Sequence, residues 1–320
     1  MKQETFENRY QHDWQAFEVI LEQLEKRQAT SVTQFSSHYR RICHYLALAK
    51  SRTYSPQLQA KLENMVLRGH QQLYTRKTQF LYNSIQFILL KFPALLRENG
   101  HFFWLATALF YLPGLVMFFA IQWDPNLVYT IMNPHQVTEY ESMYDPTLRR
   151  IGRDRQSDTD IMMFGFYIWN NIGVAFKTFA GGILVTVGSL FFMLFNGLFF
   201  GAFASHIVNV GYQNTFFPFV IGHGAFELTA ITIAGAAGIK MGYSLLAPGN
   251  LSRLDALKQS AKVAIQLLLG AAFMLVIAAF VEAFWSSSTL LTPTLKYGIG
   301  ALFWLLVAGY LGLGGKSHAT

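Results

Sequence analysis

Two ionisable residues lie inside an apolar, glycine-rich stretch that runs from Pro218 to Gly238. They are His223 and Glu227, and in a helix this spacing of four places them on one face, one turn apart. An ionisable side chain at membrane depth costs roughly 2.5–3.5 kcal/mol on insertion scales, so such residues are usually functional. The pair suits ligand binding or proton transfer, because histidine titrates near neutral pH. The alternative is a buried ion pair that only fixes helix packing.

Other polar residues in apolar stretches could complete a site with this pair. Glu282 lies near the end of an apolar span, where it could reach the membrane surface or face the same cavity. Asparagines in lipid need a partner, and a hydrogen bond to another helix is the simpler explanation for them. The predicted intramembrane polar site consists of His223, Glu227, Asn171, Asn196 and Glu282.

Metal binding and catalysis are weaker readings of these residues. A metal would need further ligands, which Glu282 or His206 could supply, but the sequence has no HExxH pattern. It has no P-loop, no GxGxxG motif after a strand and no GxSxG elbow either. We therefore predict no metal, no cofactor and no catalytic residues.

The glycines are expected to have two roles. Gly222 and Gly224 flank His223, and we predict that they break the helix there, so that a half-helix beginning near Gly224 aims its free N–H groups at an anion. Elsewhere, small faces let helices approach closely. We expect this packing role for Gly197, Gly235 and Gly238.

The composition separates a basic first third from a membrane domain. Only 13% of the 320 residues are charged, against about 25% in a typical soluble domain. Residues 1–100 hold 14 of the 25 Lys and Arg residues and 8 of the 18 Asp and Glu residues. The net charge of +7 fits basic segments on the cytoplasmic side of a membrane, and no basic run with interleaved aromatic residues suggests nucleic acid. Cys43 is alone, which excludes a disulfide within the chain and a cysteine metal cluster.

Residues 1–100 are predicted to form a cytoplasmic bundle of three amphipathic helices. Apolar residues recur at spacings of three and four in each helix, which is typical of one buried face. Pro56 suits a helix start and Pro93 a helix end. The stripes are Phe6, Tyr10, Trp14, Phe17, Leu21 and Leu24, then Phe35, Tyr39, Ile42 and Leu46, then Leu58, Leu62, Met65 and Leu73.

Residues 101–320 are predicted to form an all-α transmembrane domain. A bilayer core needs about 20 apolar residues per helix. Residues 122–163 are polar and are expected to form an extracytoplasmic loop with a short amphipathic helix around Val137, Tyr140, Tyr144 and Leu148. The apolar stretches are His101–Ile121, Phe164–Val210, Phe217–Leu246, Val263–Phe284 and Tyr297–Leu313.

Two of these stretches are too long for one ordinary crossing. Counting each of them once gives five spans and puts the basic link at 247–262 outside, against the tendency of Lys and Arg to stay in the cytoplasm. A re-entrant turn at Asn196-Gly197 or at Gly222–Gly224 would resolve this conflict. We expect five or six membrane segments with at least one broken helix.

Several motifs resemble the stage II sporulation protein M family of integral membrane proteins. They are Met163–Asn171, Phe195-Asn-Gly197 with Gly201, Gly222-His-Gly-Ala-Phe-Glu227 with Ile233-Ala-Gly235 and Gly238, and Ala278-Ala-Phe-Val-Glu282. The stretches Tyr39-Arg-Arg and Leu46–Arg52 resemble the extension of longer members. The resemblance implies an all-helical protein of the bacterial inner membrane. In spore formers the family member anchors a complex of cell-wall-degrading partners during engulfment.

Three functions are consistent with these observations. The first is a non-enzymatic scaffold for an envelope or cell-wall remodelling complex, in which the cytoplasmic helices and the 122–163 loop bind different partners. The second is a transporter or channel-like protein for a small or lipidic substrate. The third is an intramembrane hydrolase with His223 as the base. The expected partners are the lipid bilayer, envelope proteins and a second copy of the chain, because the small-residue faces suit a homodimer.

Overall fold

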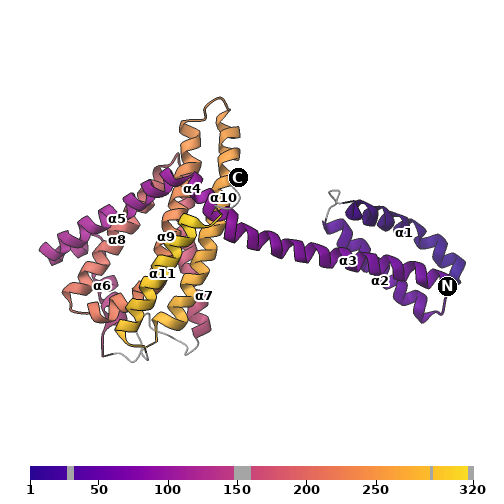
Figure 1. Ribbon diagram of the computed structural model, residues 1–320, viewed down its shortest axis with the longest axis horizontal. Coiled ribbons are helices and arrows are strands. Elements are labelled where there is room, and N and C mark those ends of the chain that lie inside the picture. Colours follow the sequence, from indigo (N-terminus) through magenta and orange to yellow (C-terminus); the bar gives the residue numbers. More distant parts are fainter. Residues whose placement is uncertain (27–31, 148–159, 289–290, 316–320) are drawn as a thin grey trace. The chain divides into compact units, whose positions relative to one another are not determined.

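A computed structural model describes residues 1–26, 32–147, 160–288 and 291–315, and its regular elements are all helices (Figure 1). The chain divides into two compact units, Met1–Gln86 and Phe87–Thr320. The all-α prediction is confirmed.

The first unit contains three amphipathic helices: α1 (Gln3–Glu25), α2 (Val32–Ser51) and α3 (Pro56–Gln86). Their apolar stripes pack on one another as the spacing predicts, although Leu73 lies outside the described side chains. Fully burying one such side chain stabilises a fold by roughly 1.5–3 kcal/mol. The core includes Phe6, Trp14, Phe17, Leu21, Phe35, Ile42, Tyr45, Leu58, Leu62 and Met65.

Polar contacts tie these three helices together at the edge of the core. Arg68 on α3 donates two hydrogen bonds of 2.8 Å to the carboxylate of Glu25 on α1. The hydroxyl of Tyr45 donates to Asp13 at 2.6 Å. Burial, together with this hydrogen bond, raises the pKa of Tyr45 to about 12.

The second unit begins with the π-helical segment η1 (Phe87–Lys91) and the short helix α4 (Phe92–Glu98). The long helices that follow are α5 (Gly100–Trp123), α7 (Asp160–Ala180), α8 (Val187–Asn209), α9 (Gln213–Leu246), α10 (Arg253–Phe280) and α11 (Pro293–Leu313). Short elements connect or extend them: η2 (Pro125–Thr130), α6 (Pro134–Tyr144), η3 (Gly181–Ile183) and η4 (Val281–Ser286).

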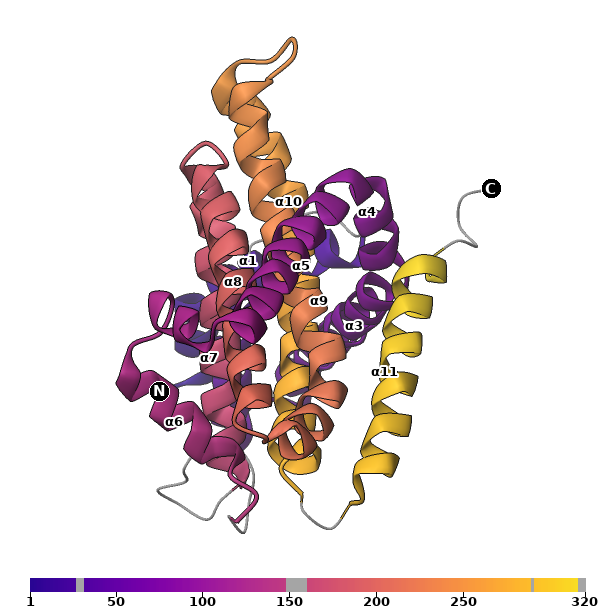
Figure 2. The same cartoon turned by 90° about the vertical axis from the view of Figure 1, so that its left-hand side faces the viewer.

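Five helices in the described part of the chain are long and apolar enough to cross a membrane: α5, α8, α9, α10 with η4, and α11. Helix α7 packs in the same bundle against α9 and α10 but carries Asn170, Asn171 and Lys177, which make it more polar. Successive long helices run in opposite directions (Figure 2). The α9–α10 connection therefore lies at the same end of the bundle as α4 and the end of α11, whereas α6 lies at the other end.

The long apolar stretch is broken at neither of the two positions considered from the sequence. The stretch 164–210 is interrupted between α7 and α8, where η3 leads into Val185 and Thr186 with φ of 51° and 73°. Gly181 and Gly188 face each other across this turn, and a Cβ on Gly181 would lie 2.6 Å from the backbone of Gly188. Both positions require glycine, because the backbones of Gly181 and Gly188 touch and leave no room for a side chain.

Neither of the two predicted breaks is present. Helix α8 continues through Asn196-Gly197, and α9 continues through Gly222–Gly224. A helical glycine costs about 1 kcal/mol relative to alanine, and packing against neighbouring helices outweighs this preference. The half-helix that was expected to begin near Gly224, with free N–H groups aimed at an anion, is therefore a wrong prediction.

The crossing of α5 and α8 shows why glycine is used inside helices here. A Cβ at Gly197 would lie 2.1 Å from the carbonyl oxygen of Phe110, and one at Gly201 would lie 2.0 Å from that of Gly114. The two helices therefore meet backbone to backbone, as small residues spaced by four permit in a membrane.

Candidate ion or ligand site

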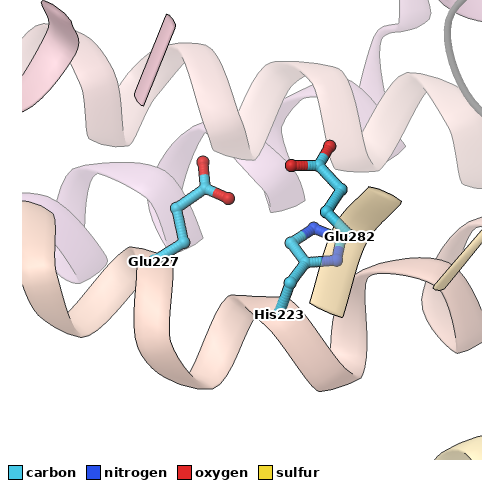
Figure 3. A group of neighbouring side chains, drawn as sticks. All are labelled: His223, Glu227 and Glu282. Carbon is cyan, nitrogen blue, oxygen red and sulfur yellow. The ribbon is translucent and has the colours of Figure 1, made fainter. Parts of the chain in front are cut away.

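His223, Glu227 and Glu282 come together in the second unit. His223 and Glu227 lie one turn apart on α9, and Glu282 is on η4. One ligand atom from each residue lies within 4.8 Å of the others. Figure 3 shows the imidazole and the two carboxylates directed into the same space.

The π-helical turn η4, which follows α10, positions Glu282 in the site. A π-turn inserts an extra residue into a helix and redirects the side chains that follow, and such turns are frequent at functional sites. Here η4 places Glu282, Trp285 and Ser286 against α9. The ring of Trp285 fills the space beside Gly222, where a Cβ would lie 2.3 Å from it.

His223 is held by its surroundings on several sides. It is 6% exposed. Its Nδ1 lies 3.0 Å from Oγ of Ser286, and the ring of Phe219 packs edge-on at 5.2 Å. The backbone carbonyl of Ser286 also accepts a hydrogen bond of 2.7 Å from the buried Lys296 of α11. When Nδ1 carries the proton and donates to Ser286, Nε2 keeps its lone pair for another partner.

The three side chains line a cavity of about 180 Å³ between α6, α7, α8, α9 and η4. Asn171 from α7 also lines it and is 3% exposed. Asn170 donates a hydrogen bond of 3.0 Å to Oδ1 of Asn171, but Nδ2 of Asn171 is buried without a hydrogen-bond partner. Four of the five predicted site residues thus share one cavity.

The fifth predicted residue, Asn196, does not line this cavity. Its amide lies 3.5 Å from Oγ1 of Thr178, which bridges α8 to α7. This is the packing role considered for asparagines in the sequence analysis. Asn196 and Asn171 are both asparagines in apolar helices. The rotation of each helix decides that Asn171 faces the cavity and Asn196 faces Thr178.

The glycines singled out from the sequence also fall into two groups, those that pack against another helix and one that lines the cavity. Gly235 packs on Met193 and Gly238 on Ser189 and Phe179, with Cβ distances of 2.2 Å to the closest side-chain atom in both cases. Gly224 has only ordinary contacts within its own helix and lines the cavity instead. It leaves room beside His223 and Glu227.

Ser286, which contacts His223, and three tyrosines that line the cavity were not predicted from the sequence. Tyr140 and Tyr144 come from α6 and Tyr167 from α7. Burial raises the pKa of Tyr144 well above its usual range, and the nearby carboxylate of Glu282 adds to the effect. The Tyr144 hydroxyl is therefore neutral near pH 7. No spacing rule links these residues to His223.

His206, considered as a metal ligand, lies elsewhere. Its Nε2 is 2.7 Å from Oε1 of Glu141, so it joins α8 to α6. Its Nδ1 is buried without a hydrogen-bond partner. The pair forms a second contact between a histidine and a glutamate, outside the group around His223.

Comparison with protein-family models gives two matches. Residues 106–287, more than half of the chain, match the model for stage II sporulation protein M. The chain belongs to this family. Residues 4–75 match a domain of unknown function (DUF8413), and this segment lies within the first unit. The searches of curated proteins and of solved structures find no match.

The stage II sporulation protein M match begins within α5 and ends just after η4. All of the residues that line the 180 Å³ cavity fall inside it. Lys296 and the rest of α11 fall outside the matched range. The cavity therefore belongs to the part of the chain that defines the family.

Proposed function

We propose that this integral membrane protein binds a small polar ligand or a cation in the cavity around His223, as a transporter or channel-like protein would. The observation that carries the proposal is the convergence of His223, Glu227, Glu282 and Asn171 on one cavity. Packing alone would be satisfied by apolar residues at these positions.

Energetics support a binding role over a purely structural one. Each ionisable group at membrane depth costs roughly 2.5–3.5 kcal/mol. When both carboxylates are ionised they also repel each other, by about 3.5 kcal/mol at 4.8 Å for an effective dielectric constant of 20. A cation or a polar ligand offsets both costs.

The position of the site favours access from the end of the bundle that carries α6. His223 is ten residues into α9, which corresponds to about 15 Å of helix. Tyr140 and Tyr144 of α6 line the same cavity. A ligand would reach His223 past α6 without crossing the full thickness of the bundle.

The antiparallel order of the helices supports a cytoplasmic N-terminus in a bacterial inner membrane. With α7 counted as a crossing, there are six, and the α9–α10 connection shares its side with α4. That side then carries Arg253, Lys258 and Lys262, in keeping with the positive-inside rule. The 122–163 segment on the other side has four arginines against seven acidic residues. The conflict raised by five crossings disappears.

The test is complementation of a deletion strain by Glu227→Gln and His223→Gln, with membrane yield measured in parallel. We expect both variants to reach the membrane at normal yield and to fail to complement the deletion. Asn196→Ala is the control, because it also removes a polar group from a membrane helix but does not line the cavity. Full complementation by both cavity variants would refute the proposal.

A scaffold role is the second candidate, and the separate first unit supports it. Helices α1–α3 have their own core and their own family match. Such a unit is suited to hold an envelope partner while the second unit anchors it. If this role dominates, the cavity variants will complement fully, and deletion of residues 1–86 will abolish partner capture. The homodimer expected from the small-residue faces is tested in the same material by crosslinking.

A further inference from the structure

We propose that His223, Glu227 and Glu282 bind one Zn²⁺ ion and leave its fourth coordination position open to the cavity. The inference rests on the proposed function, since it names the ligand of the same cavity. It adds a metal where the sequence patterns predicted none.

The spacing of the ligand atoms is close to what zinc requires. In a tetrahedral site with Zn–N and Zn–O distances near 2.0–2.2 Å, neighbouring ligand atoms are about 3.3–3.6 Å apart. The three ligand atoms here lie within 4.8 Å of one another. Rotation about the glutamate side-chain torsions would bring the carboxylate oxygens closer to Nε2 of His223.

The three residues have an arrangement that is common among metal ligands. Two of them lie one turn apart on a helix, so both face the same point, and the third comes from a neighbouring element. Ser286 holds Nδ1 of His223 at 3.0 Å, which leaves Nε2 as the ligand atom. A second hydrogen bond of this kind fixes the tautomer and the ring orientation of a coordinating histidine.

The donor set favours zinc over other common cations. Mg²⁺ and Ca²⁺ prefer oxygen ligands and six or more positions, whereas one imidazole and two carboxylates match an open zinc site with three protein ligands. Among the described residues that line the cavity there is no lysine or arginine. The cavity therefore offers an entering cation the carboxylates of Glu227 and Glu282.

Asn171 places a polar donor in the cavity beside Glu227 and the open position. Its Nδ2 is buried, has no hydrogen-bond partner, and belongs to a side chain that lines the cavity and is 3% exposed. Leaving such a donor unsatisfied destabilises the fold. A water molecule or another oxygen ligand on the metal would accept this hydrogen bond.

The experiment uses the full chain without a histidine tag, purified in detergent, stripped with a chelator and titrated with Zn²⁺ against a competing chelating dye. We expect one zinc per chain by elemental analysis. His223→Gln, Glu227→Gln and Glu282→Gln should each weaken binding by more than about 100-fold, which exceeds the 10–100-fold effect of outer partners. Glu141→Gln, which removes the acidic partner of His206, should bind like the wild type.

Co²⁺ substitution supplies a second measurement, because four-coordinate Co²⁺ absorbs visible light strongly. A strong band in the wild type that is lost in Glu282→Gln supports the site even if a histidine variant folds poorly. Substoichiometric zinc in the wild type, or zinc retained by all three cavity variants, would overturn the proposal. Preference for Mg²⁺ or Ca²⁺ would overturn the choice of metal. If zinc does not bind but the cavity variants still fail to complement, the proposed function stands with a different ligand.

Discussion

Nδ1 of His223 lies 3.0 Å from the hydroxyl oxygen of Ser286, and this contact joins α9 to the π-turn at the end of α10. It sets the direction of the imidazole toward Glu282 and Glu227. Ser286 is 0% exposed, so water cannot replace its hydroxyl without a change in packing. The orientation of the site therefore depends on a serine that does not itself face the ligand.

The first prediction concerns this serine. Ser286→Ala removes a hydrogen-bond partner of Nδ1, so the imidazole is less firmly oriented and zinc affinity should fall by about 10-fold. The dye titration described above measures the change. Ser287→Ala is the matched control, because that hydroxyl donates to Ala283 in its own helical turn. Equal affinities for the two variants would contradict the role given to Ser286.

The second prediction concerns the α5–α8 contact. Gly201→Ala places a methyl group 2.0 Å from the carbonyl oxygen of Gly114, and backbone atoms cannot yield as a side chain does. We expect a loss of about 1–3 kcal/mol, the usual range for overpacking, seen as a lower unfolding temperature in detergent. Gly165→Ala on α7, where a Cβ meets nothing within 4 Å, should leave that temperature unchanged or raise it.

The third prediction concerns the pH dependence of the first unit. Hydrogen bonds from Arg68 lower the pKa of Glu25 below 4.5 in the folded state. A carboxyl group with a lowered pKa stabilises the fold above its unfolded value, and this stabilisation is lost as the pH falls through the folded value. The pair is partly exposed, so its contribution is at most about 1 kcal/mol.

Glu25→Gln should therefore reduce protection of α1–α3 in amide hydrogen exchange at pH 7, and the difference from the wild type should shrink below pH 4.5. Glu63→Gln serves as the control, since Lys50 and Glu63 are both more than half exposed. A difference that grows on acidification would show that the sign is wrong.

The fourth prediction concerns topology. In a Cys43→Ser background, Gly249→Cys in the α9–α10 connection and Asn133→Cys before α6 should react with an impermeant thiol reagent from opposite sides of the membrane. The reason is the alternating direction of the helices, which puts the α9–α10 connection and α6 at opposite ends of the bundle (Figure 2). Gly249→Cys should be protected in intact cells and Asn133→Cys labelled. Labelling of both from one side would contradict six crossings.

The sequence alone determined the features that depend on local spacing. Apolar stripes at intervals of three and four predicted α1–α3, and apolar length predicted the membrane helices, because both signals depend on neighbours along one helix. The spacing of His223 and Glu227 likewise placed them on one face. These predictions needed no knowledge of which helices touch.

The tertiary structure decided everything that depends on contact between helices. Glu282 joins His223 because η4 packs on α9, whereas Asn196 turns toward Thr178. The break falls at Gly181 and not at Gly222, since a glycine opens a helix or tightens its packing according to what lies against it. Neither helix rotation nor the identity of a neighbour is encoded in a local pattern, so the composition of the cavity emerged only when the helices were assembled.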